Sequence, residues 1–184
     1  MNVNKIQLPP ITCNHNQAKP VLEIIVHNIL FCRTLGVRVS CKEVESYFFD
    51  DVMYVVIDDD NIINIVKQEL TNVCQSNNED MLPITISLFY SIKKNGILGE
   101  YDEKIEFERW KIDLNLMSYR SFVEEDVLRN EIKAAVDTIL NYQELPEQMP
   151  NYEKFSFHIT SVVPHKDGGI YDMIRSLPRM FATP

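Results

Sequence analysis

The sequence has few glycines and few basic residues. It contains only five glycines in 184 residues, so a glycine-rich loop that cradles phosphate is nearly excluded. Lysine and arginine together number 18 against 27 aspartates and glutamates, which gives a net charge of −9. No basic stripe stands out along the chain. Because contact with nucleic acid or an anionic membrane needs clustered cations, we expect neither as a partner.

Cysteine and long apolar runs are also scarce. The four cysteines form no C-x-x-C pair, and they stand at Cys13, Cys32, Cys41 and Cys74. No secretory leader opens the sequence, so we expect reduced thiols in a cytoplasmic protein. The longest apolar run, Val21–Cys32, is interrupted by polar residues and is too short to cross a bilayer. We therefore expect no stable membrane insertion.

No catalytic constellation is visible. The four histidines are scattered, and neither an H-E-x-x-H motif nor a nucleophile elbow occurs. Asp58-Asp59-Asp60 precedes apolar residues at helical spacing, which is typical of a helix N-terminus rather than a calcium loop. The sequence thus predicts no enzyme, no metal and no cofactor. A small enzyme whose site assembles only in the fold stays an alternative.

The hydrophobic pattern is that of an α+β protein. Helical spacing of apolar residues predicts helices from about residue 17, from about 60 and over 122–142. Period-two alternation predicts strands at 37–41, 52–57, 84–90, 105–116 and 152–163. An edge strand or extended arm is expected over Lys5–Cys13, because Pro9-Pro10 cannot donate to a ladder. The order of elements predicts one domain, residues 1–184, with three helices on a mostly antiparallel sheet.

Several finer features follow from the same pattern. Asn16 is expected to cap the first helix, which is apolar on most sides and therefore central. His27 falls on its polar side. A phase change near Glu108-Arg109 indicates a β-bulge. Val127 and Leu140 are expected to face inward from the third helix. The tail, residues 164–184, carries an apolar stripe that docks on the chain's own sheet or on a partner.

Two surfaces are candidates for partner binding. Gly96-Ile97-Leu98-Gly99 forms the tip of a predicted hairpin, where Ile97 and Leu98 either project as an apolar knob or fold back onto the sheet edge. Arg129 and Lys133 are four residues apart, so they share a helix face that meets an acidic partner or is ordinary surface charge.

Four strings, in this order, resemble a known family. They are Val26–Gly36, Tyr54–Ile57, Ile86–Tyr90 with its return strand around Trp110, and Tyr142–Pro150 followed by Phe155–Thr160. Over about residues 5–181 the chain resembles the autophagy-related protein 101 family, whose members are HORMA-domain proteins.

The resemblance implies a non-enzymatic adaptor that works in the cytoplasm, at the phagophore assembly site. Members of the family pair with the HORMA domain of autophagy-related protein 13 and stabilise it in the kinase complex that starts autophagosome formation. HORMA pairing uses the end of the first helix and the third helix. In this sequence, that implies partner-binding roles for Phe31, Cys32, Arg33 and Lys133.

The resemblance also bears on the hairpin tip and the C-terminal region. Members often carry a tryptophan-proline-phenylalanine finger at the tip that recruits downstream autophagy-initiation factors, whereas this sequence has Ile97 and Leu98 there. The segment between Met149-Pro150 and the last strand is short, which disfavours the peptide-trapping belt of other HORMA proteins. A checkpoint-type HORMA protein that traps a peptide stays an alternative.

Overall fold

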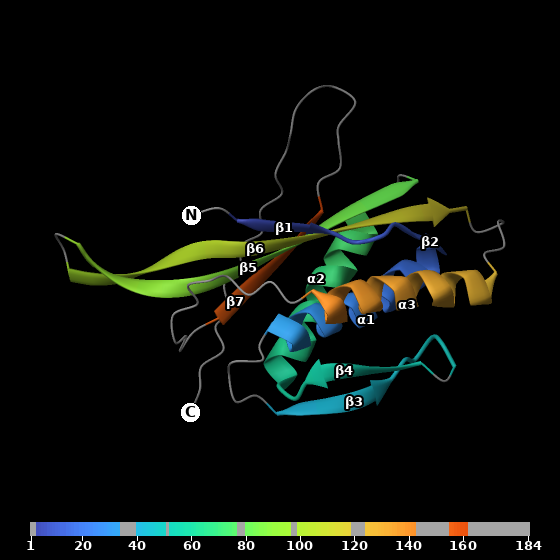
Figure 1. Ribbon diagram of the computed structural model, residues 1–184, viewed down its shortest axis with the longest axis horizontal. Coiled ribbons are helices and arrows are strands. Elements are labelled where there is room, and N and C mark those ends of the chain that lie inside the picture. Colours follow the sequence, from blue (N-terminus) through green and yellow to red (C-terminus); the bar gives the residue numbers. More distant parts are fainter. Residues whose placement is uncertain are drawn as a thin grey trace, which may run out of the picture.

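Three helices cover one face of a five-stranded sheet (Figure 1). The computed structural model describes residues 3–33, 40–50, 52–76, 80–96, 99–118, 124–142 and 155–161. Hydrophobic side chains from the helices and from one sheet face form the core. The predicted α+β class and its three helices are confirmed, and the architecture is consistent with a single HORMA-like domain.

The sheet is built around a long antiparallel hairpin. Its strands are β5 (Met81–Gly96) and β6 (Gly99–Met117), and β7 (Phe155–Ser161) pairs antiparallel with β5. On the other side, β1 (Asn4–Gln7) and β2 (Ile11–Asn14) pair in parallel with β6. The sheet is therefore mixed but mostly antiparallel. The edge position expected for the first segment is confirmed, with Pro9-Pro10 between β1 and β2.

A β-bulge interrupts the hairpin close to the predicted position. Leu88 pairs with Glu108 but Phe89 pairs with Glu106, so Phe107 is the extra residue on β6. Phe107 and Glu108 are consecutive, yet each is only 1% exposed. This follows because an extra residue resets the alternation of side chains, so that both neighbours face the helices.

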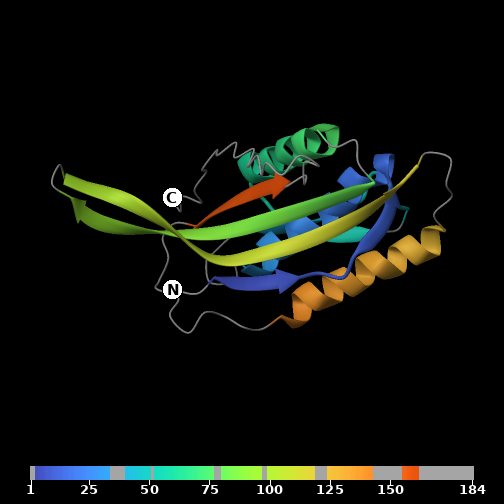
Figure 2. The same cartoon turned by 90° about the horizontal axis from the view of Figure 1, so that it is seen from above.

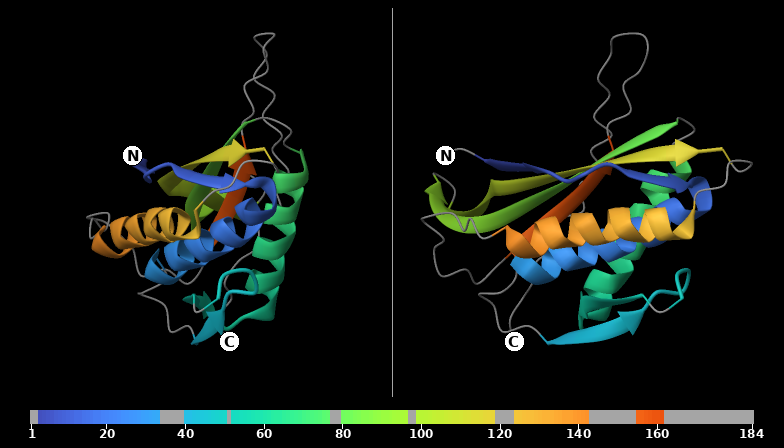
Figure 3. Two further views of the ribbon diagram at one scale, coloured as in Figure 1. Left: turned by 90° about the vertical axis from the view of Figure 1, so that its right-hand side faces the viewer. Right: turned by 45° about the vertical axis from the view of Figure 1, so that its right-hand side comes forward.

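Helix α1 (His15–Arg33) is the centre of the helical layer. It lies between α3 (Glu125–Asn141) and α2 (Asp60–Ser76), as the end-on view shows (Figure 3). The predicted Asn16 cap is wrong, because the helix already begins at His15. The backbone N–H of Asn14 instead donates to Oε1 of Gln17 at 2.8 Å.

His27 is buried rather than on a polar side of α1, so that prediction is wrong. Its side chain is 3% exposed, and its ring centroid lies 5.9 Å from that of Tyr54. Tyr54 belongs to β4 (Met53–Ile57), which pairs with β3 (Cys41–Glu45) in a small second sheet beside α1. Burial disfavours the charged imidazole and lowers the pKa of His27 to about 4.

The remaining helices largely follow the sequence. Oδ1 of Asp59 accepts from the backbone N–H of Asn61 at 2.8 Å, so the acidic run opens α2 as predicted. Helix α3 buries a row at helical spacing, namely Leu128, Ile132, Ala135 and Ile139. Val127 and Leu140 are 46% and 53% exposed, so the prediction that they face inward is wrong. The apolar face in contact with the core is narrower than hydrophobicity alone suggested.

Some predicted features lie outside the described residues. These are Val37–Val39 of an expected strand, the helix end at Gly36, the tip residues Ile97 and Leu98, and the tail 164–184.

Adjacent residues on α3 test this packing. We expect Ile139→Ala to lower the free energy of unfolding by about 2–5 kcal/mol, because Ile139 is fully buried in the core. Leu140→Ala removes a side chain of similar size from an exposed position and should change it by less than about 1 kcal/mol. Urea denaturation of both variants measures the difference. Equal losses would contradict the observed orientation of α3.

Candidate partner-binding surface

The C-terminal ends of α1 and α3 meet at one end of the helical layer. The two helices run side by side in the same direction (Figure 1). Arg33 is the last residue of α1, and Tyr142 immediately follows α3. The guanidinium carbon of Arg33 lies 4.6 Å from the Tyr142 ring centroid, and Nη1 donates to the Tyr142 carbonyl oxygen at 3.4 Å. Arg33 thereby links the two helix ends.

The same guanidinium forms a buried ion pair with the bulged strand. Nε of Arg33 lies 2.7 Å from Oε1 of Glu108, and the two side chains are 4% and 1% exposed. Nε1 of Trp110 donates to the same carboxylate oxygen at 2.5 Å. The guanidinium carbon also lies 5.5 Å from the Trp110 ring centroid, within range of a cation–π interaction. One arginine therefore ties two helices to β6.

Burial and the neighbouring groups have opposite effects on the charge of Glu108. Burial raises the pKa of the Glu108 carboxyl above its ordinary value, while Arg33 and the Trp110 N–H act in the opposite direction. Arg33 also lies at the C-terminal ends of two helices, where unpaired carbonyl groups favour a cation. Each charge in the pair is compensated by the other, so removal of either one strands a charge in the core.

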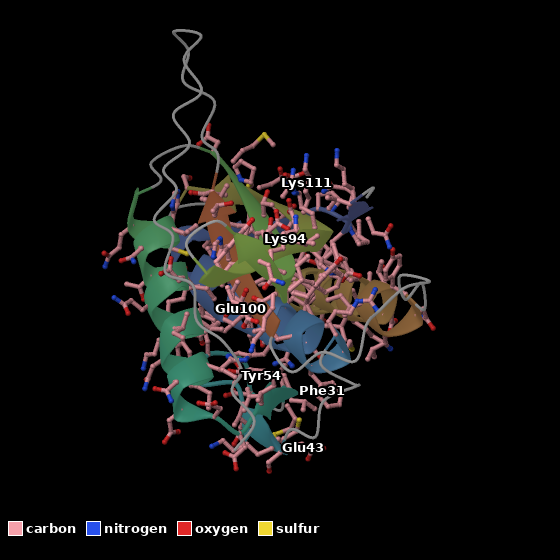
Figure 4. All side chains as sticks on the ribbon, turned by 90° about the vertical axis from the view of Figure 1, so that its left-hand side faces the viewer. Phe31, Glu43, Tyr54, Lys94, Glu100 and Lys111 are labelled. Carbon is pink, nitrogen blue, oxygen red and sulfur yellow. The ribbon has the colours of Figure 1, made fainter. Side chains whose placement is uncertain are left out.

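The residues expected to bind a partner at the end of α1 differ in accessibility. Arg33 faces inward, so its guanidinium belongs to the core. Phe31 and Cys32 are half-buried, and Phe31 is visible at the end of α1 in Figure 4. Cys32 packs against the core, and burial raises the pKa of its thiol. Of the three residues expected to bind a partner at the end of α1, Phe31 and Cys32 have exposed parts that a partner could touch, whereas Arg33 is buried.

Lys133, in contrast, is exposed on the outer side of α3. It belongs to a row at helical spacing that we call the α3 stripe, formed by Arg129, Lys133, Val136 and Leu140. Nη2 of Arg129 donates to the Asp50 carbonyl at 2.8 Å and to Glu125 at 2.6 Å. Lys133 and Leu140 are the exposed members of the stripe.

Sequence reasoning missed Leu140 as a surface residue. Its hydrophobicity placed it with the core, although it lies seven residues, two helical turns, after Lys133. That spacing was the available signal, because two residues seven apart share a helix face. The stripe brings together Lys133 and Leu140, whereas Arg33 is separated from both by its burial.

The hairpin that carries the second candidate surface projects beyond the helices (Figure 2). Gly96 pairs with Gly99 at its end, and Gly99 has a φ of +120°, a conformation that favours glycine. Ile97 and Leu98 lie outside the described residues. Tyr101, which sequence reasoning did not single out, is 52% exposed near the tip. The ends of β5 and β6 next to the tip therefore extend beyond the helices, where a partner could reach them.

The buried ion pair yields a direct prediction. Arg33→Met leaves Glu108 charged and unpaired, so we expect it to lower the free energy of unfolding by about 3–5 kcal/mol. Arg33→Met with Glu108→Gln removes both charges and should be less destabilised than the single variant. Urea denaturation of the two variants and the wild type measures this. If Arg33→Met lowered the free energy of unfolding by less than about 1 kcal/mol, as is typical of surface substitutions, the assignment of a buried ion pair would be contradicted.

The pH dependence provides an independent readout of the same pair. The raised pKa means that the folded state binds this proton more tightly than the unfolded state, whose Glu108 titrates near 4.5. Without Arg33 the pKa rises further. Lowering the pH from neutral toward about 5 should therefore narrow the gap in stability between Arg33→Met and the double variant. A gap that widens toward acid would contradict this assignment.

Comparison with known proteins agrees with this architecture. The family model described as autophagy-related protein 101 matches residues 10–152, which is more than half of the chain. A search of curated proteins finds no match. Among the described residues, no helix has the length and apolar character needed to span a membrane. On the strength of the family match, the chain belongs to the autophagy-related protein 101 family.

Proposed function

We propose that this chain is a non-enzymatic adaptor that pairs with the HORMA domain of autophagy-related protein 13. Membership of the autophagy-related protein 101 family supports an autophagy function. The observation that carries the proposed pairing is the α3 stripe, where an exposed leucine and an exposed lysine lie two turns apart on one face of a helix fixed to the core. In this role the adaptor stabilises its partner within the kinase complex that starts autophagosome formation.

The α3 stripe has the physical properties of a contact surface. Leu140 is 53% exposed, so a partner that covers it gains about 1 kcal/mol from the apolar area removed from water. Lys133 adds a charge that selects an acidic group on the partner. The neighbouring side of α3 is buried in the core, and its C-terminal end is held through Tyr142 and Arg33. A stripe that is already ordered loses little conformational entropy on binding.

A double substitution on the stripe tests the pairing. Lys133→Glu with Leu140→Asp reverses the charge and removes the apolar contact, so we expect affinity for the HORMA domain of autophagy-related protein 13 to fall at least about tenfold. Isothermal titration calorimetry with the purified domain measures this. Thermal unfolding of the variant establishes that it remains folded.

Val127→Asp with Lys67→Glu is the matched control. It makes the same change in net charge at exposed positions away from the stripe. The control should bind within about twofold of the wild type, because distant surface charges are largely screened. Unchanged affinity of the stripe variant, or an equal loss in the control, would overturn the assignment of the pairing surface to α3.

We further propose that the Ile97-Leu98 tip contacts other autophagy-initiation factors, as an apolar counterpart of the family's aromatic finger. Ile97→Asp with Leu98→Asp should reduce the capture of those factors from cell extract and leave binding to autophagy-related protein 13 unchanged, because the hairpin extends away from α3. Affinity capture with quantitative mass spectrometry measures both. Capture of every factor at the wild-type level would refute a role for the tip.

A further inference from the structure

The sheet has a second face, which no described helix covers. All three described helices lie on the other side (Figures 1 and 3). On β6 after the bulge, every second residue is buried toward the helices, namely Trp110, Ile112 and Leu114. Strand alternation therefore places Arg109, Lys111 and Asp113 on the second face. Lys5 and Gln7 of β1 pair with Arg109 and Lys111, so they share it.

Four cations gather on this face, in a chain whose net charge is −9. We call them the β6 basic row: Lys5, Lys104, Arg109 and Lys111. Lys5 lies directly across from Arg109, and Lys111 follows two residues further along β6. Lys104 lies on the same face before the bulge, opposite Ser91. From Lys104 to Lys111 the row extends roughly 20 Å along the strand.

Internal pairing leaves most of this positive charge available. Nε and Nη2 of Arg109 contact the two carboxylate oxygens of Glu106 at 2.8 and 2.6 Å, which fixes Arg109 against the sheet. Lys5 and Lys111 are exposed and form no ion pair with any residue that the structure describes. Figure 4 labels Lys111 on the side of the sheet away from the helices.

Neutral hydrogen-bonding groups border the row. Ser87 lies opposite Arg109 and Thr85 opposite Lys111, and Thr160 of β7 pairs with Thr85. All three are half-buried on the same face. The Ser87 hydroxyl already donates to the Glu106 carboxylate, so Thr85 and Thr160 supply the hydroxyl groups for a ligand. A surface of lysines beside hydroxyl groups is suited to carboxylates, because ammonium groups neutralise their charge and hydroxyls donate hydrogen bonds to them.

We propose that the β6 basic row binds an extended acidic segment of a protein partner. Alternate side chains of an extended peptide repeat about every 6.8 Å, the same spacing that separates Arg109 from Lys111 along β6. Carboxylates on one side of such a segment can therefore meet successive cations of the row. The face lies on the opposite side of the sheet from α3. This partner and a HORMA domain on the α3 stripe can therefore bind the chain at the same time.

The charge pattern favours a peptide over a bilayer or a nucleic acid. Glu106 and Asp113 are interspersed with the cations, and the chain as a whole is strongly acidic. A bilayer or a duplex covers a wide area and meets the repulsion of the surrounding acidic surface. A narrow peptide senses mainly charges within a Debye length, about 8 Å at physiological salt. With Lys93 and Asp102, which pair next to Lys104 on the same face, five cations stand there against three carboxylates.

Fluorescence anisotropy with the full chain tests the proposal. The probe is a labelled peptide of alternating glutamate and serine, and its glutamine counterpart is the neutral reference. We expect the acidic probe to bind, the neutral one not to bind, and the affinity to fall as salt is added. Lys5→Glu with Lys111→Glu should weaken binding at least about fivefold at low salt.

Lys67→Glu with Asn64→Asp and Gln68→Glu is the charge-matched control, on exposed positions of α2 that belong to neither proposed binding surface. It should bind the acidic probe within about twofold of the wild type, since its charges lie on the other side of the sheet. No binding of the acidic probe, or equal losses in the two variants, would overturn the proposal. Binding to phosphatidylserine vesicles that depends on Lys5 and Lys111, without binding to the peptide, would overturn it in favour of a membrane.

Discussion

The buried ion pair between Arg33 and Glu108 is the interaction on which the helical layer depends. It joins the last residue of α1 to β6, and its cation also contacts Tyr142 at the end of α3. A buried ion pair adds little stability over an apolar replacement, but each charge makes the other indispensable. We therefore expect the pair to fix how the helices lie on the sheet. The outward orientation of the α3 stripe follows from that arrangement.

The regular elements were readable from the sequence, because burial on one face imposes a period. The alternation in β5 and β6, the phase change at Phe107 and the acidic start of α2 all follow from such periods. Arg33 was not readable in this way. Arginine is usually exposed, and its carboxylate partner is 75 residues away in the sequence. The predictions for His27 and Leu140 were wrong for a related reason, since neighbours from other elements decide which sides of a helix are covered.

The proposed binding surfaces show the same division between local and long-range information. Lys133 was found from its spacing to Arg129, because both lie on one helix. The β6 basic row could not be predicted from the sequence, because Lys5 and Arg109 are brought together only by the pairing of β1 with β6. An acidic chain thus presents a local cationic face on one side of its sheet and a mixed apolar and cationic stripe on the other. Two such faces would let the adaptor proposed above hold two different partners.

Amide hydrogen exchange of Arg33→Met against the wild type tests the central claim, that Arg33 holds the ends of α1 and α3 together. Exchange in the β5–β6 hairpin beside the helices serves as the reference for global unfolding. The account predicts that the last turns of both α1 and α3 lose protection beyond that reference. Loss confined to α1, with the end of α3 as protected as in the wild type, would contradict it.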